Sequence, residues 1–132
     1  MIASRDARVR QKPLTAVELE LMNIVWDIGP CTVAQMLEAL PAGRDLAYTS
    51  VSTIVRILEQ KGYVRSEKAG RGHRYSALVS KDAYQASSLK HLVRNVFDDT
   101  PSLLVRRLLD SDALDAEDLK QIRELLRRRG GA

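Results

Sequence analysis

Apolar side chains recur every three to four residues in the first third of the chain, which predicts two amphipathic helices. Their apolar stripes are Leu19, Met22 and Trp26 in the first helix, and Val33, Met36, Leu37 and Leu40 in the second. Each helix begins at a Thr that has Glu or Gln three residues later, the spacing of a capping box. These residues are Thr15 and Thr32, and the Gly-Pro pair at 29–30 separates the two helices.

A third amphipathic helix ends at Gly62 and has two faces of different chemistry. Its core stripe follows the spacing i, i+3, i+4, i+7 and consists of Val51, Ile54, Val55 and Leu58. The opposite face holds no acid and consists of Thr49, Ser52, Thr53 and Arg56. Short hydroxyl side chains and one Arg suit contact with base edges and phosphates, whereas hydroxyl residues are poor helix formers on an ordinary solvated face. We therefore favour nucleic-acid contact over a merely solvated surface.

Two strand-forming segments follow at residues 63–68 and 73–78, with a Gly-rich turn at 69–72. This pattern predicts a β-hairpin with Arg71 at its tip. Three helices followed by a basic hairpin is the order of a winged helix-turn-helix domain. In such a domain the third helix reads DNA, and the hairpin, called the wing, contacts the backbone or the minor groove.

Three more helices are predicted in the C-terminal part, the first capped by Ser80, the second by Thr100 with Pro101 at its first position, and the third by Asp115. They are too few and too short to form a good core alone, so a second copy of the same segment is the expected partner. The residues assigned to the dimer interface are Leu89, Leu92, Val93, Val96, Leu104, Leu108, Leu119, Ile122 and Leu126.

The predicted fold is therefore mainly α, with a winged helix-turn-helix domain and a three-helix dimerisation segment. We expect a flexible basic arm over residues 1–13, a DNA-binding domain over 14–79 and a dimerisation domain over 80–132. Charge agrees with this division, because residues 61–74 hold five basic residues and one acid, while 98–118 hold seven acids and two Arg. A basic segment in one half suggests that this half meets a polyanion.

The residues predicted to contact DNA are Tyr48, Thr49, Ser50, Ser52, Thr53, Arg56, Lys68, Arg71 and Arg74. For Tyr48 we favour phosphate or sugar contact over burial. Neither a phosphate loop nor a Ser-His-Asp arrangement nor a metal-ligand spacing is visible, so we expect no enzyme, no metal and no cofactor. The single Cys, Cys31, is expected to be a small buried residue. No apolar run approaches the ~20 residues of a membrane span, so a cytoplasmic protein without membrane insertion is expected.

A second function class stays open at this stage. A winged-helix module that binds protein rather than nucleic acid would share the same core. It would need neither the hydroxyl and Arg face of the third helix nor the basic wing.

Two stretches resemble the penicillinase-repressor (BlaI/MecI/CopY) family of bacterial transcription regulators: LTAVELELMNIVW at 14–26 and LAYTSVSTIVRILEQKG at 46–62. Residues 73–75 fit the family's wing strand and 114–119 the start of its last helix, so the resemblance spans about 14–126. It implies a homodimeric repressor that binds palindromic promoter DNA. In the antibiotic-responsive branch, a membrane-bound sensor metalloprotease triggers cleavage in the C-terminal helices on a β-lactam or related cell-wall signal. The copper-responsive branch is disfavoured because no Cys follows Cys31.

Overall fold

The computed structural model describes residues 13–130, so all of the predicted basic arm except Pro13 lies outside the described residues. The chain forms two compact units, which we call the head (Met1–Lys90) and the tail (His91–Ala132). The two units divide within a helix, whereas the domain boundary expected from the sequence, between residues 79 and 80, precedes that helix.

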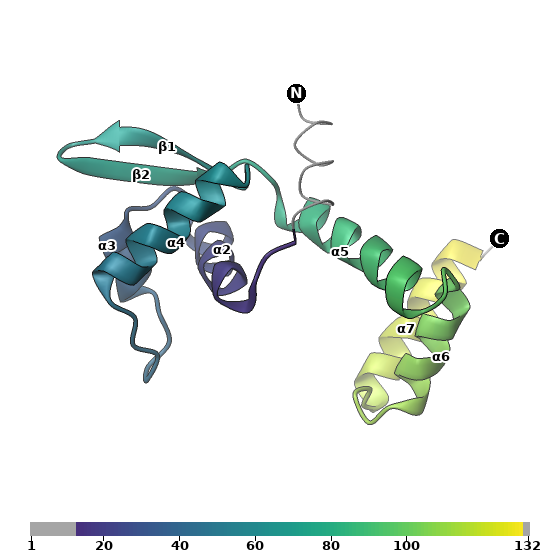
Figure 1. Ribbon diagram of the computed structural model, residues 1–132. Coiled ribbons are helices and arrows are strands. Elements are labelled where there is room, and N and C mark those ends of the chain that lie inside the picture. Colours follow the sequence, from purple (N-terminus) through teal and green to yellow (C-terminus); the bar gives the residue numbers. More distant parts are fainter. Residues whose placement is uncertain (1–12, 131–132) are drawn as a thin grey trace. The chain divides into compact units, whose positions relative to one another are not determined.

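The head contains three helices followed by an antiparallel hairpin (Figure 1). The elements are α2 (Ala16–Ile28), α3 (Val33–Glu38), α4 (Tyr48–Gln60), β1 (Val64–Ala69) and β2 (Gly72–Ala77). α4 packs on α2 and α3 and also contacts β1, while β2 contacts α2. This is a winged helix-turn-helix fold with β1 and β2 as the wing, as the sequence predicts.

Short-range sequence signals set the starts of α2 and α3. The Thr15 hydroxyl accepts a hydrogen bond from the Glu18 N–H (3.2 Å), and the Glu18 carboxylate accepts one from the Thr15 N–H (2.9 Å). Thr32 and Gln35 make the same reciprocal pair at the start of α3. Both predicted capping boxes are therefore confirmed, and each satisfies helix-start N–H groups that would otherwise lack a partner.

The end of α4 explains a one-residue error in the predicted hairpin. Gly62 takes a positive φ of 88°, which a residue without Cβ adopts readily, and the Tyr63 N–H donates to the Leu58 carbonyl (3.0 Å). Because Tyr63 completes the helix end, β1 begins at Val64 rather than at Tyr63. The second strand likewise covers Gly72–Ala77 rather than 73–78.

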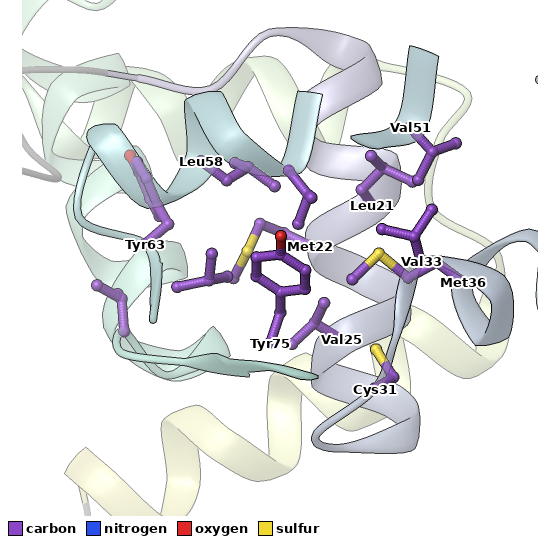
Figure 2. Packing of buried hydrophobic residues seen from close by; sticks show 13 residues of the cluster. Leu21, Met22, Val25, Cys31, Val33, Met36, Val51, Leu58, Tyr63 and Tyr75 are labelled. Carbon is purple, nitrogen blue, oxygen red and sulfur yellow. The ribbon is translucent and has the colours of Figure 1, made fainter. Parts of the chain in front are cut away.

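The hydrophobic core lies entirely in the head: every buried apolar residue of the described chain falls between Leu21 and Val79. Figure 2 shows Met22 and Val25 of α2 beside Tyr75 of the wing. Cys31 is buried, as expected, and burial raises the pKa of its thiol. Its backbone also pairs with Tyr75 in an isolated antiparallel bridge, with N–O distances of 3.1 and 2.8 Å. The wing is thus tied to the connection between α2 and α3.

A buried ion pair links the start of α2 to the end of α4. The Lys61 Nζ lies 2.7 Å from the Glu18 Oε1, and Glu18 is the buried charged residue of the head core. Burial raises the pKa of the Glu18 carboxyl, but hydrogen bonds from Lys61 and from the Thr15 N–H outweigh this and leave the pKa below its ordinary value. The pair therefore helps to hold α4 in place on α2.

We expect Lys61→Met to lower the free energy of unfolding at pH 7 by about 1–3 kcal/mol, because Glu18 would stay buried without its cationic partner. A carboxyl with a lowered folded-state pKa stabilises above its unfolded pKa, and the effect is lost as the pH falls through the folded pKa. The difference between wild type and variant should therefore shrink in acid. Urea unfolding at pH 7 and pH 3 measures it, with Lys68→Met as the control at an exposed Lys. An equal effect of both substitutions would contradict the assigned role.

The helix that leaves the wing, α5 (Lys81–Val96), begins on the head. The Tyr84 ring lies 5.7 Å from that of Trp26 and 5.9 Å from that of Tyr63, centroid to centroid. The Trp26 Nε1 donates to the Val79 carbonyl (2.9 Å), which fixes the segment just before α5. Ser80 caps α5 as predicted, because its hydroxyl accepts from the Ala83 N–H (3.0 Å).

The tail continues with α6 (Pro101–Asp110) and α7 (Ala116–Gly130). Asp115 caps α7 as predicted, accepting from the Asp118 N–H (2.8 Å). Thr100 is the N-cap residue of α6, as predicted. Pro101 does begin α6, but the Thr100 hydroxyl donates to the Asp98 carbonyl (3.0 Å) and makes no cap hydrogen bond. The two residues before Thr100, Asp98 and Asp99, have positive φ values of 54° and 55°.

Candidate nucleic-acid interface

α4 presents its polar residues away from the core. Val51, Val55 and Leu58 are fully buried on one side of the helix. Thr49, Thr53 and Arg56 are exposed on the other side, and Ser52 is half-buried at its edge. Ser50 is exposed, and so is Tyr48, with 58% of its surface accessible. Six residues predicted to contact DNA are therefore brought together on or beside one accessible helix face.

The start of α4 differs from the starts of α2 and α3. Its N-cap residue is Ala47, no side chain caps it, and its first turn holds no acid. Backbone N–H groups of this turn are therefore left for an outside acceptor, and the positive end of the helix dipole favours an anion. Both properties suit a DNA phosphate at this end of α4.

The strand register separates the basic residues of the wing into two groups. Ser66 pairs with Tyr75 and Lys68 with His73, and alternation places these four on one face of the hairpin. That face is the one turned to α4, because the Ser66 hydroxyl donates to the Glu59 carboxylate of α4 (2.7 Å). Lys68 therefore lies on the α4 side of the wing.

Arg74 lies on the other face of the wing, directly opposite Glu67. The sequence alone does not show this pairing, which sets an acid beside one of the predicted contacts. Arg71 occupies the exposed turn between the strands, next to Gly70 with its positive φ of 60°. Of the three wing residues predicted to contact DNA, Lys68 and Arg71 are thus the two without an acid directly opposite.

Two residues that sequence reasoning missed belong to this surface. Glu59 anchors the wing to α4 through Ser66, and no short-range signal reveals that contact. Gln60 is exposed and continues the row of Thr49, Thr53 and Arg56, four residues beyond Arg56. The same helical spacing that selects those three would have found it. A Gln side chain can donate to and accept from an adenine edge.

Other kinds of chemistry find little support among residues 13–130. That part of the chain shows no group of three or more His, Cys, Asp or Glu placed to hold a metal ion. None of its helices combines the length and apolar character that crossing a bilayer requires.

The sequence profile of the penicillinase repressor family matches residues 14–128. The chain belongs to this family. It is 32% identical over 115 residues to the transcriptional regulator BlaI of Mycobacterium tuberculosis, covering 74% of this chain and 83% of BlaI. It is 21% identical over 116 residues to the methicillin resistance regulatory protein MecI of Mammaliicoccus sciuri, covering 88% of this chain and 94% of MecI.

Among solved structures, an ArsR-like transcriptional regulator from Rhodococcus sp. RHA1 is similar with a TM-score of 0.47 and 18% identity, covering 83% of this chain and 96% of that one. Family membership makes the chain a DNA-binding transcriptional repressor of the BlaI/MecI type. It confirms the resemblance seen in the sequence.

Proposed function

We propose that the chain represses transcription as a homodimer on a palindromic operator, with one α4 in the major groove of each half-site. The observation that carries this is the outward face of α4, where hydroxyl groups and Arg56 lie without an acid beside an uncapped helix start. The wing then contacts the neighbouring backbone through Lys68 and Arg71. Arg74 contributes less because Glu67 is opposite.

The surface of α5, α6 and α7 supports the dimer. None of the residues of α5, α6 and α7 is buried. All nine residues assigned to the interface are exposed or half-buried, and Val96 and Leu126 are 61% and 65% accessible. Val105, Leu109 and Leu125 add to this apolar surface although they were not assigned to it. Apolar surface of this kind marks an interaction site, and a second copy in a symmetric dimer covers it on both chains at once.

We further propose that proteolysis in the tail releases the repressor, triggered by a membrane-bound sensor metalloprotease on a β-lactam or related cell-wall signal. The similarity to a methicillin resistance regulatory protein supports this signal class. Immunoblots of cells that carry the chain, taken before and after β-lactam addition, should show a shortened form only after addition. A chain of constant length during induction would refute this route without affecting the DNA-binding proposal.

Selection of bound duplexes from a random pool tests the operator directly. The purified chain should enrich inverted repeats whose half-site centres lie one helical turn of DNA, about 34–36 Å, or a multiple of it apart. Enrichment of single half-sites alone would contradict the dimer. If no sequence is enriched and salt abolishes binding equally on every duplex, the result would favour the protein-interaction alternative.

The wing contacts are tested by the salt dependence of binding. In a dimer, Lys68→Ala or Arg71→Ala removes two phosphate contacts, so the log–log salt slope should become shallower by about two units. Arg74→Ala should change the slope by less. Fluorescence anisotropy across a salt series measures the slopes, with Lys120→Ala on α7 as a matched control of equal charge change. An unchanged slope in the Lys68→Ala, Arg71→Ala double variant would place the wing away from DNA.

A further inference from the structure

An open groove of about 370 Å³ lies on the head between α2 and the first turns of α5, on residues that the DNA interface does not use. Leu19 and Trp26 of α2 and Tyr84 of α5 form its apolar walls. Its volume falls at the small end of the range for ligand sites in proteins, which suits a compound of one or two rings.

Contacts with the rest of the head hold the two aromatic side chains of this groove in place. Trp26 is fixed by the hydrogen bond from its Nε1 to the Val79 carbonyl (2.9 Å). Tyr84 rests against the rings of Trp26 and of the buried Tyr63, at 5.7 and 5.9 Å. Two preformed aromatic surfaces therefore border the groove, and a planar ring gains most from contact with such surfaces.

The polar lining of the groove consists of Asn23, Lys81, Gln85 and Ser88. None of these four side chains makes a hydrogen bond or an ion pair within the described part of the chain. Lys81 is the one charged residue among those that line the groove, so its charge is uncompensated there. The groove thus offers an aromatic slot with a free cation and neutral hydrogen-bonding groups at its border.

We propose that this groove binds a small planar aromatic carboxylate. The ring lies against Trp26 and Tyr84. The carboxylate accepts hydrogen bonds from the Lys81 ammonium group and from the neutral polar groups beside Lys81. A charge-assisted hydrogen bond at a partly apolar site is stronger than a neutral one, which favours the acid over its amide. This site lies beyond the repressor function proposed above and needs no DNA.

A neighbouring hollow adds one electrostatic feature that sharpens the test. It shares Asn23 and Lys81 with the groove and is also lined by Glu20 and Asp27. Glu20 is already neutralised by Arg44, with two N–O distances of 2.9 Å. Asp27 has no ion-pair partner in the described part of the chain, so its negative charge opposes the binding of an anion near Lys81. Its removal should strengthen binding of a carboxylate.

The experiment uses the full chain and two probes of nearly equal shape, 2-naphthoate and neutral 2-naphthamide. The chain has one Trp, so the indole N–H of Trp26 gives a single resonance from the wall of the groove. Titration should shift this resonance in a saturable way. Lys81→Gln should weaken naphthoate about fivefold and leave naphthamide within twofold, since one partly exposed charge contact is removed. Asp27→Asn should strengthen naphthoate about twofold, and Lys90→Gln, on the same helix but outside the lining, should leave both probes unchanged.

Three results would overturn the proposal. One is an indole resonance that does not respond to either probe. Another is a Lys81→Gln chain that binds naphthoate as tightly as wild type while its remaining spectrum shows an intact fold. The third is equal weakening by Lys81→Gln and Lys90→Gln, which would show only a general charge effect. DNA binding is measured separately, so failure here leaves the repressor proposal standing.

Discussion

A chain that ends at Lys90 is expected to fold, to remain monomeric and to bind a full palindrome about 10²–10⁴ times less tightly than the intact chain. In a dimer, binding of one head makes contact of the second head effectively intramolecular, which raises affinity by about that factor without any new DNA contact. The truncated chain keeps the whole core and the α4 face but loses α6, α7 and the end of α5. Its affinity for a single half-site should therefore equal that of the intact chain.

The residue at which the chain is truncated decides whether the experiment measures loss of the dimer or loss of head stability. A chain that stops near Ser80 would lose Tyr84, whose ring packs on Trp26 and Tyr63, and would confuse head instability with loss of the dimer. Stopping at Lys90 follows the division of the chain into its two compact units. Sedimentation of both chains gives the oligomeric state, and anisotropy on full and half-site duplexes gives the affinities.

A full-length variant separates the effect of the interface from that of truncation. Leu108→Glu with Leu126→Glu places charges at two exposed positions of α6 and α7, so each single chain should fold as before. Burial of these charges against a second copy would be costly, so the variant should be monomeric and lose the palindrome preference. A variant or truncated chain that stays dimeric, or that binds the full operator as tightly as wild type, would refute the interface.

Much of the head could be predicted from the sequence because its signals are local. The capping boxes at Thr15 and Thr32 need only a four-residue window, and the structure confirms both. The predicted core stripe of the third helix is also a short-range pattern: Val51, Val55 and Leu58 are fully buried, and Ile54 is half-buried against the core. Once one helix face is known to be buried, the residues on the opposite face follow from helical geometry.

Contacts between distant residues could not be predicted in this way. The Cys31–Tyr75 bridge, the Lys61–Glu18 pair and the packing of Tyr84 on Trp26 each join residues more than 40 positions apart. No periodicity along the chain encodes such pairs. They decide how the wing, α4 and α5 attach to the core, and therefore which side chains meet in the candidate sites.

The strand register shows the same limit at shorter range. Glu67 and Arg74 belong to one basic segment of the sequence, but only the pairing of β1 with β2 places them opposite each other. A shift of one strand by one residue would have turned its side chains to the other face and placed Lys68 and Arg74 on the same face. The relative weight of the wing cations therefore depends on the register and not on local charge alone.

Arg56→Ala is expected to weaken operator binding by about 1–3 kcal/mol for each half-site if Arg56 reads a guanine, and the loss applies to both heads of the dimer. Arg56 is exposed on the outward face of α4 and makes no ion pair within the described chain, so its removal should leave the fold intact. Thermal unfolding of the variant checks this point. The preference for one base pair in each half-site should relax at the same time.

Arg56→Lys distinguishes base reading from phosphate contact. Lys keeps the charge but lacks the planar pair of donors that matches the two acceptors of guanine. If Arg56 reads a base, the Lys variant should lose most of the preference at that pair while keeping its affinity for unrelated duplexes. Anisotropy on the operator and on duplexes with each half-site base changed in turn measures both effects. Equal weakening of Arg56→Ala on every sequence would reassign Arg56 to phosphate, and unchanged affinity would remove it from the interface.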